Sequence, residues 1–132
     1  MAINNSPPII GSKELVIQTI AMPAATNALG DIFGGWILSQ MDLGGALLAK
    51  KTCKNKIVTV AIDAMKFHKP VRVGDVVSCY ASVVKIGRTS VAIKVEVWIT
   101  PFESEGALQQ VTEGVFTYVC IDEKGVPKPI PR

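Results

Sequence analysis

The sequence predicts an α+β fold in which an antiparallel sheet wraps around one long helix, and two observations carry this prediction. Only residues 32–51 have the pattern of a long helix, and this stretch is apolar nearly all round, which is typical of an enclosed helix. The rest of the chain is rich in Val and Ile at strand spacing, with no second helical stretch. A helix followed by consecutive strands is an α+β order, and a curved sheet is the simplest cover for the helix.

The residues before the helix are expected to form an arm, one short strand and a loop. Residues 1–12 contain Asn and Pro clusters that suit no regular element, so we predict a flexible arm there. Residues 15–22 alternate well enough for a short strand that Pro23 ends. Asp31 has the right side chain for the N-cap of the helix, and two lysines in the last turn suit the negative end of the helix dipole.

Four strands are expected after the helix, at residues 57–65, 75–86, 88–99 and 110–121. In the third, apolar residues alternate with Lys94 and Glu96, which predicts one face in contact with water. The fourth is apolar on both sides, which is typical of a central strand or of a strand at a subunit interface. The predicted domain covers residues 13–122, and a Pro-rich tail follows at residues 123–132.

The composition predicts association with further copies of the chain and argues against several classes of protein. Of 132 residues 48% are hydrophobic, whereas a domain of about this size removes only roughly two-thirds of its surface from water. We therefore expect a homo-oligomer. No apolar run approaches the roughly 20 residues of a membrane span, and no secretory signal is recognisable. The net charge of +3 is scattered and aromatic residues are few, so neither a membrane nor nucleic acid is expected as a partner.

The three cysteines, Cys53, Cys79 and Cys120, are odd in number and lack the spacing of a zinc site. We expect reduced thiols in the core of a cytoplasmic protein, and no metal site. His68 is the only histidine and has no carboxylate or cysteine near it in the sequence, so it is expected on the surface of a strand.

Asp42 is the only carboxylate inside the predicted helix. A rotation of 100° per residue places it on the face with the smallest side chains: Gly35, Leu38, Ser39, Gly45, Ala46 and Ala49. A carboxylate in such a place either caps a backbone group or pairs with a cation, or it serves as a general base or nucleophile. The residue pattern alone leaves these alternatives open.

Four glycines in the helix also need a reason, because each costs about 1 kcal/mol of helix stability. They form two pairs, Gly34 with Gly35 and Gly44 with Gly45. One reason is steric, since glycine lets another backbone or side chain come close. The other is chemical, since first-turn N–H groups without a side chain in front of them form a site for an anion or oxyanion. The sequence favours neither reason over the other.

Four segments together resemble the hotdog-fold acyl-CoA thioesterases of the YciA type: residues 26–50 (TNALGDIFGGWILSQMDLGGALLAK), 57–60 (IVTV), 67–71 (FHKPV) and 73–77 (VGDVV). The resemblance runs over nearly the whole chain, from about Leu15 to the tail. It implies a hotdog fold and the hydrolysis of acyl-CoA thioesters to free CoA and a carboxylic acid. It also implies that no cofactor is needed beyond the CoA of the substrate, and that dimers assemble into hexamers as trimers of dimers.

The resemblance assigns roles to individual residues. Asp42 matches the catalytic carboxylate of the family. Asp31 matches a position that related thioesterases fill with Asn or Asp, which changes it from a cap into an expected active-site residue. Gly34 and Gly35 would offer backbone N–H groups to the thioester oxygen, and Thr59 would orient water.

The substrate-binding residues that the resemblance implies are Asn27 and the loop residues Arg88, Thr89 and Ser90, where an arginine suits the phosphates of CoA. Phe33 departs from many hotdog relatives, including the dehydratases, which have a histidine before the glycine pair. Two alternatives to hydrolysis remain. One is a non-catalytic hotdog module that binds CoA esters, and the other is a hydratase or dehydratase, which Phe33 disfavours.

Overall fold

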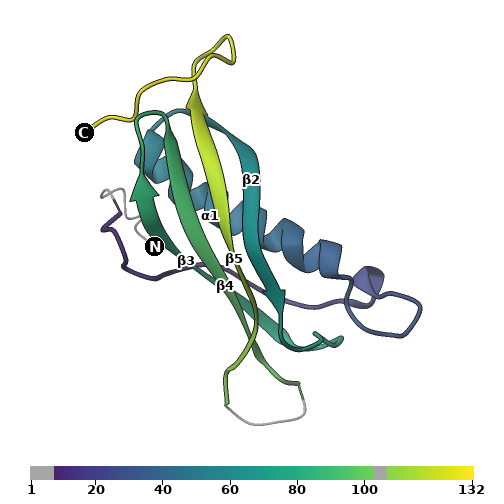
Figure 1. Cartoon of the computed structure of the whole chain (residues 1–132). Coiled ribbons are helices and arrows are strands. Elements are labelled where there is room, and N and C mark those ends of the chain that lie inside the picture. The colour runs from purple at the N-terminus through teal and green to yellow at the C-terminus, as the bar shows by residue number, and fades with distance from the viewer. Residues whose placement is uncertain (1–7, 103–106) are drawn as a thin grey trace.

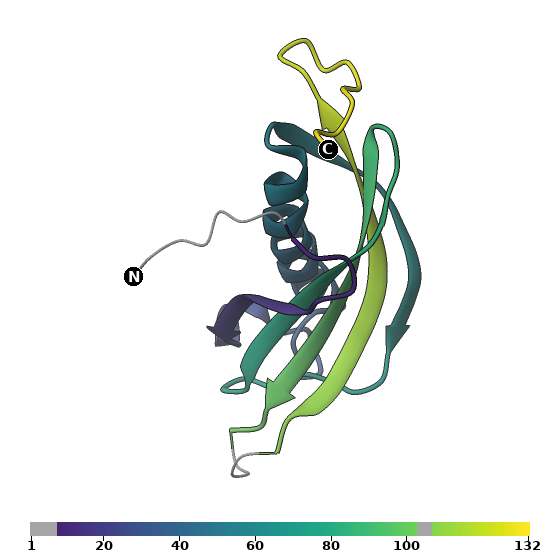
Figure 2. The same cartoon turned by 90° about the vertical axis from the view of Figure 1, so that its left-hand side faces the viewer.

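A five-stranded antiparallel sheet curves around a single long helix in the computed structural model, which describes residues 8–102 and 107–132 (Figure 1). The helix lies along the concave side of the sheet, as the turned view shows (Figure 2). The predicted α+β architecture is confirmed. Residues 1–7, which make up most of the predicted N-terminal arm, and residues 103–106 fall outside the described residues.

The elements follow one another as β1 (Glu14–Ile20), a 3-10 turn (Pro23–Ala25), α1 (Gly34–Cys53), β2 (Lys56–Phe67), β3 (Val76–Ile86), β4 (Ser90–Thr100) and β5 (Gln109–Ile121). In the sheet the strands lie in the order β1-β3-β4-β5-β2, and every neighbouring pair is antiparallel. β5 is thus an interior strand, as its two apolar sides predict. β2 is an edge strand, paired on one side only within this chain.

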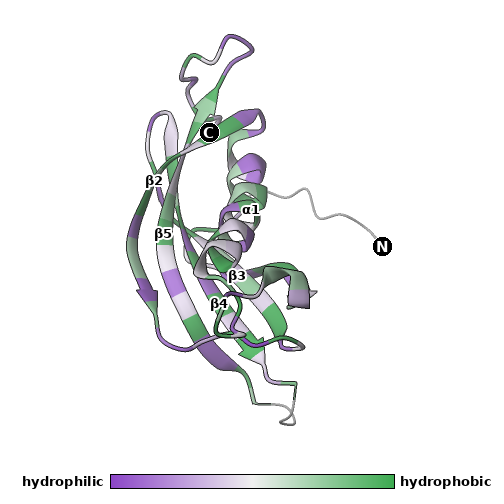
Figure 3. Ribbon diagram, turned by 90° about the vertical axis from the view of Figure 1, so that its right-hand side faces the viewer, coloured by the Kyte–Doolittle hydropathy of each residue, from purple (hydrophilic) through white to green (hydrophobic). Residues whose placement is uncertain are grey.

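The core lies between the helix and the concave face of the sheet. β4 contributes Val91, Ile93 and Val95, which are fully buried as their alternation predicts. Glu96, expected on a wet face, is only 6% exposed. The prediction is wrong there because Lys13, from the segment before β1, places its Nζ 2.7 Å from Glu96 Oε2 and covers it. Figure 3 shows hydrophobic residues along the sheet, with hydrophilic ones in the turn that follows β5.

The helix begins later than predicted, at Gly34 rather than residue 32, and Asp31 is not its N-cap. Phe33 occupies that position, and no side chain bonds to the first-turn amides. The reason lies in the preceding chain, whose backbone is already paired with other segments. The amide of Ile32 donates to the Val71 carbonyl (2.9 Å), and that of Phe33 donates to the Ala25 carbonyl (2.8 Å). The backbone is free to turn into a helix only after these bonds.

The C-terminal tail packs against the turn between β3 and β4. The amide of Ile130 donates to the Arg88 carbonyl (2.8 Å), and the Ile130 side chain is buried. The Arg132 guanidinium donates to the Gly87 carbonyl (2.7 Å). At the start of the tail the Asp122 carboxylate accepts two backbone N–H bonds, which lower the pKa of that carboxyl. The tail is therefore held at both ends.

Two of the three cysteines form a disulfide, which corrects the expectation of three reduced thiols. Cys53 ends α1, Cys120 lies near the end of β5, and their Cα atoms are 5.8 Å apart. A separation of 67 residues in the sequence hides this proximity, which arises because the end of the helix packs over β5. Cys79 is a buried thiol, as expected, and burial raises its pKa to about 12.

Removal of the disulfide is expected to lower the free energy of unfolding. In the double variant Cys53→Ser, Cys120→Ser, a cross-link across a long loop is lost, and such links typically contribute about 2–4 kcal/mol. Urea unfolding with and without a thiol reductant measures the effect. Reductant should lower the unfolding midpoint of the wild type to about that of the double variant, and it should leave the midpoint of the double variant unchanged. Equal unfolding midpoints of the wild type in both conditions would contradict the expectation.

Candidate active site

The Asp42 side chain lies between the helix and the edge strand β2. Its Oδ1 accepts a hydrogen bond from the Thr59 hydroxyl of β2 at 2.8 Å. Asp42 is half-buried, and no cation of residues 8–102 or 107–132 lies within 4 Å of its carboxylate. The alternative that Asp42 serves an ion pair within the chain therefore has no support. The structure brings together two of the expected catalytic residues, with Asp42 Oδ2 left for other chemistry.

A third residue that the sequence analysis missed also contacts Asp42. The hydroxyl of Tyr118, on β5, donates to the backbone carbonyl of Asp42 at 2.8 Å. Tyr118 is completely buried. The sequence gives one signal for it, since a tyrosine that alternates with Phe116 and Cys120 on the inner face of an apolar strand carries a hydroxyl that needs a buried partner.

The two glycine pairs of the helix have different surroundings. A Cβ on Gly44 would lie 2.8 Å from Val16 of β1, and a Cβ on Gly45 would clash with the Tyr118 hydroxyl. The steric reason thus holds for this pair. A Cβ on Gly34 would meet the Phe67 ring at an ordinary 3.8 Å, and one on Gly35 would meet nothing within 4 Å among the described residues. No close approach explains the first pair, which favours the chemical reason.

The first turn of α1 is accordingly an open set of backbone donors, which we call the glycine turn (Gly34 and Gly35). A helix leaves its first amides without intrahelical partners, and here no side chain caps them. Both glycines are exposed. The positive end of the helix dipole adds to the attraction for a developing negative charge. The arrangement suits a carbonyl oxygen that becomes an oxyanion.

The two other expected residues near the helix start, Asn27 and Asp31, close the loop that precedes the glycine turn. The Asn27 Oδ1 accepts N–H bonds from Leu29 (2.9 Å) and Asp31 (3.1 Å), and the Asn27 amide donates to the Asp31 carbonyl at 2.7 Å. The backbone of Asp31 also pairs with that of Arg72 in an isolated antiparallel β-bridge. Neither side chain bonds to Asp42 in the part of the chain that the structure describes. Within one chain they shape the loop.

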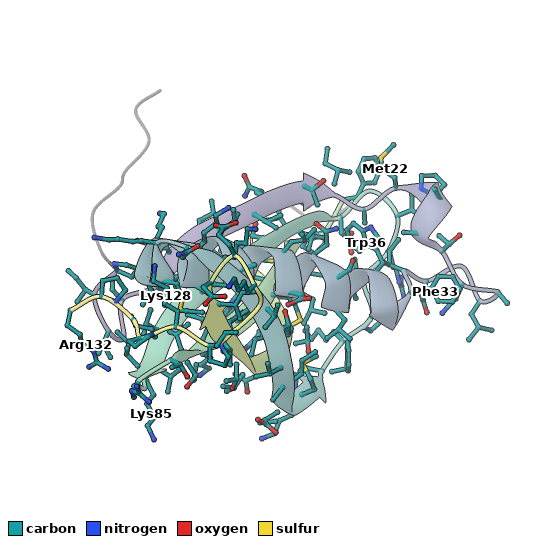
Figure 4. The ribbon with its side chains drawn as sticks, turned by 90° about the horizontal axis from the view of Figure 1, so that it is seen from above. Met22, Phe33, Trp36, Lys85, Lys128 and Arg132 are labelled. Atoms are coloured by element: carbon teal, nitrogen blue, oxygen red, sulfur yellow. A yellow bond between two sulfur atoms is a disulfide. The ribbon has the colours of Figure 1, made fainter. Side chains whose placement is uncertain are left out.

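The expected CoA-binding residues lie at the other end of the molecule. Arg88 is an exposed residue in the turn between β3 and β4, Thr89 follows it, and Ser90 begins β4. Figure 4 shows Lys85, Lys128 and Arg132 gathered at this end, whereas Met22, Phe33 and Trp36 lie at the opposite end. The packed tail thus adds two basic side chains to the Arg88 turn, a concentration of positive charge that the scattered charges of the sequence do not reveal.

The candidate residues do not form one complete site within a single chain. Gly34 and Asp42 are eight residues apart, which corresponds to about 12 Å along the helix axis. One thioester group cannot contact the glycine turn and the carboxylate at that spacing. A groove of about 530 Å³ between β1 and the end of α1 is lined by Leu15, Leu47 and lysines, and includes neither Asp42 nor the glycine turn.

Other kinds of site find no support in the described residues. Among residues 8–102 and 107–132 no group of three His, Cys, Asp or Glu side chains could hold a metal ion. His68 lies just beyond β2, is 42% exposed and has Nε2 4.0 Å from Glu113 Oε1, so it is a surface residue as expected. Within the same described ranges, no helix is both long and apolar enough to cross a membrane.

A five-stranded antiparallel sheet curved around one long helix is the hotdog fold, and in this chain the helix carries a carboxylate and begins at an open glycine turn. The family model of the Thioesterase superfamily matches residues 29–101. The acyl-CoA thioester hydrolase YciA of Salmonella typhimurium is 54% identical over 120 residues, which cover 89% of this chain and 90% of the relative.

Solved structures of thioesterases are similar to this chain as well. A hexameric broad specificity acyl-coenzyme A thioesterase is 53% identical with a TM-score of 0.87, and the match covers 90% of this chain and 87% of the other. A hexameric thioesterase from Yersinia pestis is 50% identical with a TM-score of 0.87, over 94% of this chain and 100% of the other. This chain belongs to the thioesterase superfamily and, within it, to the acyl-CoA thioester hydrolases of the YciA type.

Proposed function

We propose that this protein hydrolyses acyl-CoA thioesters to free CoA and a carboxylic acid. The observation that carries the proposal is the Asp42 carboxylate, oriented by Thr59 through one oxygen and free of any cation within the described chain. It lies on a helix whose first-turn amides are open. The names of the relatives, an acyl-CoA thioester hydrolase and a broad specificity acyl-CoA thioesterase, support the same reaction.

In the proposed reaction Asp42 Oδ2 takes a proton from water, and the water oxygen adds to the thioester carbonyl carbon. The carbonyl oxygen becomes an oxyanion that accepts hydrogen bonds from the amides of Gly34 and Gly35, and losing one such donor typically costs about 3 kcal/mol. The carbon–sulfur bond then breaks, and the proton on Asp42 goes to the CoA sulfur. Thr59 orients the carboxylate. Water is the only co-substrate, so the proposal includes no metal or other cofactor.

A second route uses the same residues with a different first step. Asp42 attacks the thioester carbon directly, CoA leaves, and water cleaves the resulting mixed anhydride. A single turnover in ¹⁸O-labelled water tests for the anhydride. Label in the Asp42 carboxylate, detected by mass spectrometry of the peptide, identifies the anhydride route with attack of water on the aspartyl carbon. Label in the carboxylic acid alone is the result expected of a general base and of an anhydride cleaved at its acyl carbon, and chemical trapping of an acyl group on Asp42 separates these two.

The site is completed by a second subunit in this proposal. The roughly 12 Å between Gly34 and Asp42 along the helix is bridged if the glycine turn of one chain lies beside Asp42 of its partner. Two features support such a dimer: the free edge of β2, and the side of α1 that the sheet leaves uncovered, where Gly35 and Ser39 are exposed, Ala46 is half-buried, and small side chains let a second helix come close. The hexameric state of two similar structures supports a trimer of such dimers.

Asn27 and Asp31 are proposed to act at the site through the loop they close before the glycine turn. Their mutual bonds fix the loop, and Asp31 lies three residues before Gly34, at the start of the helix where the thioester would lie. A cytoplasmic location is also part of the proposal. Its support is the substrate, because a CoA ester carries several phosphate charges and does not cross a membrane unaided.

Arg88 is proposed to bind CoA phosphates together with the neighbouring Thr89 and Ser90. Arg88→Gln is expected to raise KM for an acyl-CoA about tenfold with little change in kcat, because a charged hydrogen bond to phosphate is lost. The same acyl group on N-acetylcysteamine lacks the phosphates, so its hydrolysis should be unaffected. Equal KM values of variant and wild type for the acyl-CoA, or an equal loss with both thioesters, would remove Arg88 from this role.

The proposed activity is tested by trapping free thiol over a panel of acyl-CoA chain lengths. Release of CoA from at least one ester, with the carboxylic acid in equal amount, is expected. CoA binding without thiol release from any ester would favour the non-catalytic binding module. A change in absorbance of an enoyl ester without thiol release would favour a hydratase.

A further inference from the structure

We propose that Tyr118 is a positioning residue for Asp42, and that β5 and β2 fix the aspartate at two points. Tyr118 holds the helix backbone at Asp42, while Thr59 holds the carboxylate. The role rests on the proposed function, because it has a meaning for the rate only if Asp42 performs the chemistry. Tyr118 does not touch the substrate in this proposal and acts only through Asp42.

The register of the sheet places the two anchors side by side. Thr59 of β2 and Tyr118 of β5 are directly opposite each other in the antiparallel pair, so their side chains share one face of the sheet. Both side chains bond to Asp42 of the helix. The Tyr118 hydroxyl lies 2.8 Å from the Asp42 carbonyl oxygen, and the Thr59 hydroxyl lies 2.8 Å from Asp42 Oδ1. The two bonds define both the place of the backbone and the direction of the side chain.

The tyrosine hydroxyl is not needed to fill space. Tyr118 lies in the core beside Phe116 with ring centroids 6.4 Å apart, where a phenylalanine ring would occupy nearly the same volume. The hydroxyl is buried, and its partner is one specific carbonyl of α1. Burial, together with the nearby Asp42, raises the pKa of Tyr118 well above its usual value. The group therefore keeps its proton and remains a donor at every working pH.

The helix makes room for this bond at one position. Gly45 lies next to the hydroxyl, and a Cβ there would clash with it and lie 3.2 Å from two carbons of the ring. Gly45 costs helix stability, so its presence is explained by the close approach of Tyr118. The missing side chain at Gly45 thus leaves space for the Tyr118 hydroxyl, which bonds to the Asp42 carbonyl.

The first test compares Tyr118→Phe with Tyr80→Phe. Tyr80 is the only other tyrosine; it is half-buried on β3, and its hydroxyl makes no hydrogen bond within residues 8–102 and 107–132. Tyr118→Phe is expected to lower kcat by about 10- to 100-fold with KM within about twofold, because small misplacements of a reacting group have effects of this size. Tyr80→Phe is expected to retain both constants. Oligomeric state and Tm are measured in parallel.

The second test separates positioning from folding. Gly45→Ala is expected to lower both Tm and kcat, because the new methyl group displaces the Tyr118 hydroxyl. Combining it with Tyr118→Phe removes the clashing atom, so the double variant should regain much of the lost Tm and none of the lost kcat. A purely structural role of Tyr118 predicts instead that kcat recovers together with Tm.

The outcomes distinguish this proposal from the proposed function. If the wild type releases no CoA from any acyl-CoA, the proposed function fails. If the wild type is active and Tyr118→Phe keeps its kcat, or loses kcat only in proportion to its loss of folded hexamer, the positioning role is overturned. An active wild type, a well-folded Tyr118→Phe with low kcat and unchanged KM, and no recovery of kcat in the double variant support it.

Discussion

Asp42→Asn is expected to lower kcat for acyl-CoA hydrolysis by about 10³-fold, in the middle of the range for general acid–base catalysis. The amide has the same shape as the carboxylate, and its oxygen can still accept the Thr59 hydroxyl bond. It cannot take a proton from water or attack a thioester. The loss therefore reports the chemistry of the carboxylate rather than the packing of the helix.

The rate is measured by thiol trapping at saturating acyl-CoA, alongside Tm and native mass. Asp63→Asn is the matched control, because Asp63 is an exposed aspartate of β2 that makes no side-chain hydrogen bond among the described residues. It should keep wild-type kcat. A folded, oligomeric Asp42→Asn protein with wild-type kcat would contradict the assignment of Asp42 under both routes.

The second large effect is expected from Ala46→Arg. Ala46 is one turn beyond Asp42 and half-buried, on the side of α1 that the sheet leaves uncovered and that is proposed to meet the helix of the partner subunit. A long charged side chain there would be buried without a partner, which costs about 3–5 kcal/mol and weakens association by a factor of about 10² or more. We expect monomers at micromolar concentration and loss of most activity, because a monomer lacks the glycine turn of its partner.

Sedimentation of the variant gives its mass, and the activity is measured on the same sample. Ile9→Arg is the control, since Ile9 is an exposed apolar residue outside the sheet and helix, 74% exposed. It should leave mass and activity as in the wild type. An Ala46→Arg protein that is monomeric and fully active would show that one chain contains a complete site.

The sequence predicts the architecture well because its signals are local. Strand alternation, the apolar helix and the turn residues each act within a few positions, and the order of elements follows from them. The start of the helix is missed by two residues, because pairing of Ile32 with Val71, far along the chain, overrides the capping preference of Asp31. Likewise, the pairing of Cys53 with Cys120 depends on how the helix lies over the sheet.

The candidate site is predicted only in part, because some of its contacts join residues that are far apart in the sequence. Asp42 stands out as a lone carboxylate on a face of small residues, and the resemblance adds Thr59, which does bond to it. Tyr118 is hidden because its hydroxyl partner is 76 residues away in the sequence. The two glycine pairs look alike in the sequence, and only their neighbours in space distinguish the steric pair from the open one.

The central claim is that Asp42 of one subunit and the glycine turn of another form one site, and subunit complementation tests it most directly. Gly34→Pro removes one amide donor at the first helical position, where proline is tolerated and where the extended Phe33 can precede it. Alone, Gly34→Pro and Asp42→Asn should each have little activity. Coexpressed in equal amounts, they should form mixed dimers in which one of the two sites is intact, giving about a quarter of wild-type activity. No activity above that of the separate variants, with mixed oligomers verified by mass, would contradict the claim.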